Sequence, residues 1–470
     1  MSSIKLRVAM GVALALSATS LLAKGTPEEV AKLGNELTFT GAIKAGNKDG
    51  SIPEWTGPSN FTAQQKSYSP QDLENLRKNK PEEIEQTLEK QAGPESVKPL
   101  YTITKANMAQ YASMLTEGHK TLLNKYPTYK MIVYKSIRTA FYPDEIYKAT
   151  VANASSATLE GTDTVKGAKL GFPFPIPKSG AEVIWNHKLK FRGSAARRFN
   201  NQAIVKPDGS YTITKLTEDV KFKYANLKEP NWDGKVYTYY LSEVISPPRV
   251  AGQITLVHEI SDISTGGGRI AYIYSPGLGR VNRAPDVGYD NPAISTDNEQ
   301  TTDQIDVFNG ALDRYNWKLI GKKDMLIPYN SYRINSPKVK YKDILKAFHI
   351  NQDLSRYELH RVWVVEATLK PGLRHIFAKR TFYVDEDSWS IAVVDNYDAR
   401  GNMFKVQEAH LFTAPFIPTV TGVPELIYDL TSNRYFATTL ANEDSITDFR
   451  ISFEDSYFDP ANLKRKARAR

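Results

Sequence analysis

The stretch "RYELHRVWVVEATLKPGLRHIFAKRTFYVDEDSWSIAVVDNYDARGNMFKVQEAH", residues 356–410, decides the fold class. It consists of β-branched and aromatic runs separated by the polar turn sequences "LKPGL", "VDEDS" and "YDARGN". Strands joined by such short connections must run antiparallel, because a parallel crossover needs a dozen or more residues. The stretch therefore predicts a four-stranded antiparallel meander.

The first strand of this meander, residues 360–369, is partly apolar on both faces. One face carries Trp363, Val365, Ala367 and Leu369, and the other carries His360, Val362, Val364, Glu366 and Thr368. Two interpretations are open. Either helices cover one side while an apolar concavity on the other faces a ligand, or two layers pack together without a cavity.

Further strands are expected throughout the second half of the chain. "VYTYYLSEVI", "GQITLVHEI" and "RIAYIYSPGLGRV" have the same β-branched and aromatic character. We therefore predict an α+β, β-rich fold built on a large antiparallel meander.

Helical signals come before the strands. Thr26 to Glu29 form a capping box with proline at the first helical position. Exposed helices are expected over 69–79 and 81–91, and a longer amphipathic helix over 104–126, followed by a strand within 129–143.

Residues 150–190 are irregular, because prolines alternate with Phe172, Phe174 and Ile176 and cannot donate to a strand ladder. We expect an extended strap here, followed by a helix that Ser179 and Glu182 cap. The predicted organisation is a signal peptide over 1–23, a helical part over 24–135 that packs on the sheet, a β half-barrel with inserted strap and helices over 136–460, and a basic tail over 461–470.

The N-terminus is typical of an export signal. Lys5 and Arg7 precede the apolar run 8–23, which is short for a membrane span, so we expect cleavage near Ala23, with an uncleaved anchor as the alternative. The chain has no cysteine, and so has neither disulfides nor a lipid-attachment cysteine. These features predict a protein of the Gram-negative periplasm that does not meet nucleic acid.

Positive charge is concentrated at the C-terminus. The formal net charge is +9, and Leu463 to Arg470 read "LKRKARAR". Clustered basic residues gain about 1 kcal/mol each near an anionic lipid surface. The tail is thus either a contact for anionic membranes or a solvated disordered end.

Catalytic motifs are scarce, and we expect no enzyme activity and no cofactor. The seven histidines are scattered, although His360 and His375 could be neighbours across a hairpin. Four carboxylates cluster in an acidic run, which could either bind a hard cation or form a solvated loop: Asp297, Glu299, Asp303 and Asp306.

The glycine-flanked sequence "GNKDG", residues 46–50, partly fits a calcium loop. Asn47, Asp49 and Gly50 occupy suitable positions, but Ala45 and Thr56 stand where two strong oxygen ligands belong. A tight polar turn is the better interpretation, which leaves Asn47 and Asp49 as weak metal candidates.

Several strings together resemble the bacterial domain-of-unknown-function 1329 family. They are "LGNELTFTGAIKAGNKDGSIPEWTG", "GFPFPIPKSGAEVIWNH", "RVAGQITLVHE", "GRVNRAPDVGYD", "DVFNGALDRYNWKLIGKKDMLIPYN" and the first part of the meander. The resemblance covers residues 25 to about 460. It implies a periplasmic protein similar to the LolA and LolB lipoprotein carriers, with an incomplete barrel wrapped around helices and an apolar cavity. It also implies an exporter of the resistance-nodulation-division type and an outer-membrane protein as partners.

The function expected from these features is a non-catalytic periplasmic carrier or chaperone for a lipid, a lipoprotein acyl chain or another hydrophobic ligand. The alternative is a structural module that bridges envelope components without cargo. The residues expected to face cargo are apolar and lie in the strap, the following helix and the meander: Phe172, Phe174, Trp185, Trp363, Val365 and Phe377.

Overall fold

The computed structural model describes residues 24–57, 75, 78–80, 97–230, 232–261, 268–284, 288–414 and 417–468. The expected signal peptide and most of the helices expected over 69–79 and 81–91 lie outside these residues. Within them, no helix is both long and apolar enough to cross a bilayer.

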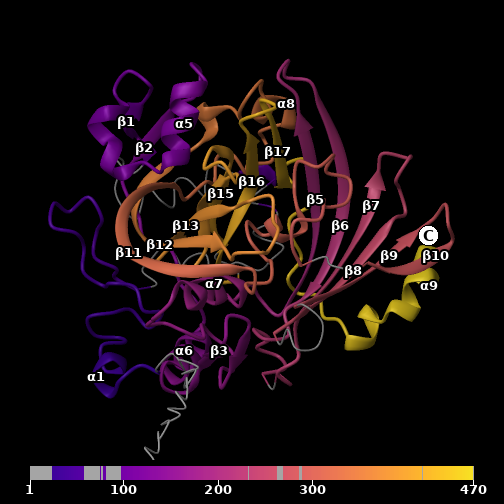
Figure 1. The fold of residues 1–470 in the computed structure, drawn as a ribbon, viewed down its shortest axis with the longest axis horizontal. Coiled ribbons are helices and arrows are strands. Elements are labelled where there is room, and N and C mark those ends of the chain that lie inside the picture. The colour runs from indigo at the N-terminus through magenta and orange to yellow at the C-terminus, as the bar shows by residue number, and fades with distance from the viewer. Residues whose placement is uncertain are drawn as a thin grey trace, which may run out of the picture.

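Most strands belong to one 15-stranded sheet (Figure 1). Its strands are β1 (Pro99–Ile103), β2 (Met131–Tyr134), β5 (Ala195–Val205), β6 (Tyr211–Lys221), β7 (Val236–Ser246), β8 (Ile254–Ile260), β9 (Arg269–Ser275), β10 (Arg280–Ala284), β11 (Tyr315–Pro328), β12 (Tyr357–Leu369), β13 (Lys379–Asp385), β14 (Ile391–Tyr397), β15 (Met403–Ala414), β16 (Thr419–Asp429) and β17 (Arg434–Leu440). A separate hairpin pairs β3 (Thr158–Glu160) with β4 (Thr164–Lys166).

The helices are short. The α-helices are α1 (Pro27–Val30), α5 (Glu117–Lys125), α6 (Asp144–Ser156), α7 (Gly180–Lys188), α8 (Tyr341–Ile344) and α9 (Leu463–Arg468). The 3-10 helices are η2 (Met108–Met114), η4 (Thr302–Gln304), η5 (Gln352–Leu354), η6 (Asp455–Phe458) and η7 (Pro460–Asn462).

The predicted meander is confirmed and continues for two more strands. The order β12-β13-β14-β15-β16-β17 is followed by β5-β6-β7-β8-β9-β10, so two meanders join where β17 pairs with β5. Successive strands pair antiparallel, whereas β2, which is remote in sequence, pairs parallel with β12. The sheet is not closed: β11 to β17 curve strongly, while β6 to β10 extend away as a wing (Figure 1).

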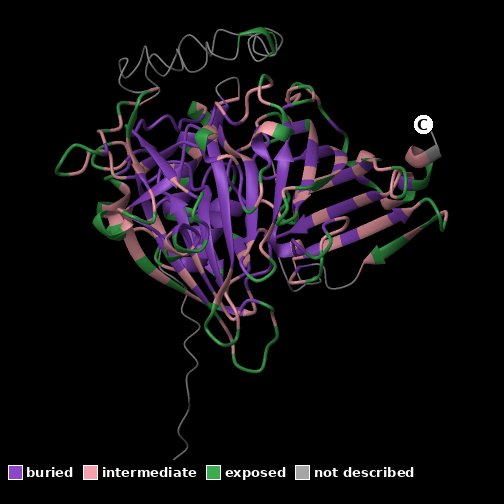
Figure 2. Ribbon diagram, turned by 90° about the horizontal axis from the view of Figure 1, so that it is seen from above, coloured by how far each residue is buried: buried purple, intermediate pink, exposed green. Residues whose placement is uncertain are grey.

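The curved part of the sheet is filled on both faces. Alternate residues of β15 point to different clusters: Val406 packs with α5 and the α8 region, and Ala409 and Leu411 pack with the strap and α7. Gly180 starts α7 close to the sheet, since a Cβ there would lie 2.7 Å from Val365. Figure 2 shows much of this part buried and the wing only partly so, while most of β11 remains intermediate or exposed.

Two expected elements are wrong in extent. The helix expected over 104–126 is broken into η2 and α5, because Leu115 is extended and the Thr116 side chain caps α5 by accepting from the His119 amide. The strand expected within 129–143 ends at Tyr134. Beyond it, the Ile137 amide donates to the Glu358 carboxylate instead of to a ladder.

Both predicted capping boxes are confirmed, at Thr26 and at Ser179. The "GNKDG" sequence is a turn, as expected. The Asn47 side-chain oxygen accepts from the Ile52 amide at 2.9 Å, and the Asp49 carboxylate accepts from the Ser51 amide at 3.0 Å. Trp55 joins this segment to the body by donating to the Ala140 carbonyl at 3.4 Å.

Gly41 fixes the approach of the N-terminal segment to the strap. Its φ is +91°, and a Cβ there would lie 1.8 Å from the Pro175 carbonyl oxygen. We expect Gly41→Ala to lower the melting temperature markedly. Gly50→Ala is the matched control, because Gly50 has φ +74° but open space around it, so it costs only the left-handed strain of about 1–2 kcal/mol. Equal melting temperatures for the two variants would contradict this role of the contact.

Candidate functional site

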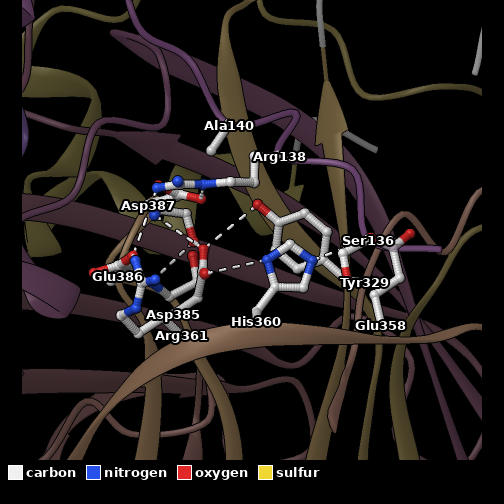
Figure 3. A network of polar contacts seen from close by, with 12 residues as sticks. Ser136, Arg138, Ala140, Tyr329, Glu358, His360, Arg361, Asp385, Glu386 and Asp387 are labelled. Atoms are coloured by element: carbon white, nitrogen blue, oxygen red, sulfur yellow. Dashed lines mark hydrogen bonds and ion pairs between the residues drawn. The ribbon is translucent and has the colours of Figure 1, made fainter. Parts of the chain in front are cut away.

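The turn between β13 and β14 carries three consecutive buried carboxylates, Asp385, Glu386 and Asp387 (Figure 3). The turn is closed locally, because the Ser388 hydroxyl donates to the Asp385 carboxylate at 2.6 Å and the Trp389 amide donates to the Asp385 carbonyl at 2.9 Å. Three adjacent acids in a buried turn need partners, since isolated buried charges are very costly.

Three cations from different elements supply these partners. Arg138 donates to both oxygens of Asp387, at 2.8 and 2.6 Å. Glu386 accepts from Arg361 at 2.9 Å and from the Lys322 ammonium at 2.7 Å. A bidentate guanidinium–carboxylate pair fixes both distance and orientation, so the turn is tied to β11, β12 and the segment after β2.

The N-terminal segment completes the coordination of Arg138. The guanidinium also donates to the carbonyls of Ile43, Lys44 and Pro53, at 2.8, 3.2 and 3.3 Å. In return, the Ile43 amide donates to Glu386 at 3.1 Å. The backbone around the "GNKDG" turn is thus bound directly to the acidic turn.

His360 on β12 links Asp385 to a second buried acid. Its Nε2 lies 3.1 Å from Glu358, and its Nδ1 lies 3.9 Å from Asp385 Oδ1. The ring stacks on Tyr329 at 3.9 Å between centroids, and the Tyr329 hydroxyl donates to Asp385 at 3.4 Å. Asp385 Oδ1 has no hydrogen-bond partner among the described residues.

The charges in the network set the proton affinities of its members. Burial and the adjacent Asp387 raise the pKa of Asp385 to about 6. Burial also opposes ionisation of Asp387, but Arg138 outweighs it and lowers the pKa of that carboxyl. For His360, burial is outweighed by Glu358, which raises the imidazole pKa.

His360, Asp385 and Asp387 could each offer a metal ligand atom, and these atoms lie within 4.8 Å of one another. However, both oxygens of Asp387 accept from Arg138, and His360 Nε2 faces Glu358. A metal ion would have to displace a guanidinium that is itself held by three carbonyls. The arrangement therefore favours a charge-compensated ion-pair network over a metal centre.

Removing the central cation should unfold the region. We expect Arg138→Met to cost about 3–5 kcal/mol of unfolding free energy, because it leaves Asp387 buried and unpaired. Arg450→Met is the control, since Arg450 pairs with Asp448 at the surface and should cost under about 1 kcal/mol. Urea unfolding followed by tryptophan fluorescence measures both. A loss as small as that of the control would show that the pair is not structural.

The raised pKa of Asp385 predicts a defined pH dependence. The folded state holds a proton between about pH 4 and pH 6 that the unfolded state releases, so the contribution of this group to stability falls as pH rises through that window. Asp385→Asn should flatten the melting-temperature profile there. Asp297→Asn, at an exposed carboxylate, should keep the wild-type slope. An unchanged slope in Asp385→Asn would refute the shift.

The residues expected to face cargo lie mostly in one packed cluster. Phe172, Phe174, Trp185 and Val365 are buried there, and Trp363 packs against it with its ring stacked on Trp389. Phe377 is buried elsewhere, between His375 and Phe404. Five of the six are buried and Trp363 is partly buried. Their contact with cargo stays a prediction.

The acidic run does not converge on a cation site. Asp297 and Glu299 both pair with Arg434, whereas Asp303 pairs with His375 and Arg380, and Asp306 with Lys190 and Arg192. The oxygens of Asn47 and Asp49, the weak metal candidates, accept hydrogen bonds within their own turn.

The suggested pairing of His360 with His375 is wrong. Residues 370–378 form a loop instead of a tight hairpin, and His375 bonds Asp303. The seventh histidine, His410, is buried near Glu408. The other six have hydrogen-bond partners: His119 with Glu408, His187 with Asp306, His258 with Phe458, His349 with Thr128, His360 with Glu358, and His375 with Asp303.

A separate apolar cluster lies on the wing. The side chains of Leu241, Ile254 and Leu256 form one face of β7 and β8, and the C-terminal segment covers this face with Phe453 and other apolar side chains. The C-terminal segment, residues 451–468, comprises η6, η7, α9 and the residues just before them. The expected basic tail is therefore ordered through α9, with Leu463 fully buried, and the alternative of a disordered end is wrong for residues 461–468.

Two clefts adjoin the C-terminal segment. The larger has room for about 430 Å³ and is lined by residues that include Ile451, Phe453, Arg465 and Lys466. The smaller, of about 220 Å³, includes Leu241 and Ile254, and both are bordered by Tyr457 and Lys466. The sequence analysis did not predict this surface or the buried network. For the buried network, the available signals were the three acids in "VDEDS" and the isolated arginine in "KSIRTAF".

An open, strongly curved antiparallel sheet with a buried ion-pair network defines the class of fold. The chain belongs to the family described as "Protein of unknown function (DUF1329)", whose model matches residues 102–464. A protein of Pseudomonas aeruginosa described as uncharacterized is 43% identical, over 99% of both chains.

Solved structures of remote relatives share part of this arrangement. A DUF1329 family protein from Desulfovibrio piger is 14% identical, with a TM-score of 0.42 over 60% of this chain and 97% of its own. A putative outer membrane lipoprotein-sorting protein domain from Vibrio parahaemolyticus is also 14% identical, with a TM-score of 0.42 over 61% of this chain and 99% of its own. At these values the likenesses carry no argument about what this protein binds.

Proposed function

We propose that the protein is a non-catalytic carrier for hydrophobic cargo in the periplasm. The observation that carries the proposal is the apolar wing: a cluster outside the main core, covered by one short segment of chain and bordered by open clefts. The smaller cleft reaches the apolar face of the wing itself, because Leu241 and Ile254 line it. An acyl chain that lies there gains about 0.8 kcal/mol per buried methylene without specific polar contacts.

The ionisable groups support a role without catalysis. In the network of the acidic turn, the three carboxylates, Arg138 and Arg361 are buried, Lys322 is partly buried, and these groups are bonded to one another. Such groups stabilise a scaffold, whereas a general acid or base must reach a substrate. A resistance-nodulation-division type exporter and an outer-membrane protein, suggested by the family resemblance, are the partners we propose for this carrier.

The first test is direct. Protein released gently from the periplasm should carry apolar molecules that solvent extraction and mass spectrometry detect, and the emptied protein should bind the fluorescent fatty acid cis-parinaric acid. An empty protein that takes up no probe would overturn the proposal and favour a structural module that bridges envelope components.

The second test places the cargo. Ile254→Ala removes apolar surface from the wing cleft and should weaken probe affinity about fivefold. Ile376→Ala is the matched control, because Ile376 lies in an exposed loop, and it should bind as the wild type does. Probe titration by fluorescence measures both. Equal affinities would place the cargo elsewhere, with the cluster around Phe172 and Trp185 as the next region to test.

A further inference from the structure

The C-terminal segment is attached to the wing by an apolar inner face and presents basic side chains on its outer face. In α9, Leu463 is fully buried and Ala467 packs in the same cluster. These residues are four apart and therefore share one face of the helix. Lys464 and Arg465 are exposed on the other side.

Polar and aromatic contacts also attach η6 to the wing. The Phe458 carbonyl accepts from His258 at 2.9 Å, and the Phe458 ring stacks on Tyr239 at 5.2 Å. Asp455 pairs with Lys221 and Lys223, but about half of its side chain is exposed to solvent. Exposed ion pairs contribute only about 0–1 kcal/mol each, so the apolar side chains provide most of the attachment.

The segment and cargo therefore compete for the same surface. The face of Leu241, Ile254 and Leu256 is apolar and is shielded from water by Phe453, Phe458 and Leu463. A surface of this kind is stable only when something apolar covers it. Before cargo arrives, the cover is the chain's own C-terminal segment.

We propose that the C-terminal segment is a releasable cover, and that an anionic lipid membrane is the surface that releases it. The proposal rests on the carrier function above and adds the partner surface and the moving element. The exposed cations Lys464 and Arg465 give α9 a charge complementary to anionic headgroups. Lys466, whose ammonium lies over the Tyr457 ring while the segment is in place, adds a third cation on release. Each basic residue gains about 1 kcal/mol near such a surface, while Leu463 and Ala467 gain an interfacial position for their apolar face. The wing is thereby exposed where lipid cargo is exchanged.

The experiment uses the full mature chain with two kinds of vesicle, phosphatidylcholine alone and phosphatidylcholine with about 30% phosphatidylglycerol. Flotation measures binding, and hydrogen exchange measures protection of the amides over 455–467. We expect binding and loss of protection with the anionic vesicles, little of either with the neutral ones, and reversal by high salt. Binding that is equal for both vesicles, or unchanged protection on anionic ones, would overturn the proposal.

The variant combines K464Q, R465Q and K466Q, and the matched control removes three exposed lysines elsewhere, with K125Q, K135Q and K323Q. The tail variant should lose anionic-vesicle binding at least tenfold, whereas the control should keep it. Equal losses would show a general charge effect and overturn the proposal.

Probe uptake separates this inference from the carrier function. If cis-parinaric acid binds in solution but vesicles leave the C-terminal segment in place, the cover proposal fails and the carrier proposal stands. If anionic vesicles release the segment but no probe binds with or without them, the membrane contact stands and the carrier proposal fails.

Discussion

The bidentate ion pair between Arg138 and Asp387 connects parts of the chain that are far apart in sequence. Arg138 follows β2, and Asp387 lies in the turn between β13 and β14. The same guanidinium donates to three carbonyls of the N-terminal segment. Glu386 adds β11 and β12 through Lys322 and Arg361. Because each partner is buried, the loss of one leaves the others uncompensated. The curvature of the sheet near this turn is therefore fixed by electrostatics as well as by packing.

These contacts explain how the N-terminal segment is held against the body although it has little regular structure. Some of its backbone groups bond one another in turns and isolated bridges, and others bond outward to Arg138, Glu386 and the Trp389 indole. Gly41 permits the close approach to the strap that this bonding requires. The polar turn "GNKDG" then reverses the chain so that carbonyls on both of its sides reach the same guanidinium.

The sequence was sufficient for features set by local patterns and insufficient for those set by distant partners. The meander from Tyr357, both capping boxes and the polar turn follow from alternation, side-chain capping and turn chemistry, all within a few residues. The joining of β17 to β5 and the convergence on Asp387 depend on residues separated by hundreds of positions. The early end of the strand after Tyr134 has the same cause, because the Ile137 amide is taken by Glu358. The charged sequence "VDEDS" indicated a turn, but it did not indicate that its three acids are buried and paired with distant cations.

These contacts give the two halves of the sheet different mechanical properties. The curved half is filled on both faces and braced by buried ion pairs, so it resists deformation. The wing has a smaller apolar cluster, and a single terminal segment covers it. A carrier needs a rigid frame and a surface that can be uncovered at modest cost. Here buried ion pairs stabilise the frame, and the cover carries the exposed cations Lys464 and Arg465. We therefore expect ionic strength and membrane charge to act more strongly on the cover than on the buried ion pairs of the frame.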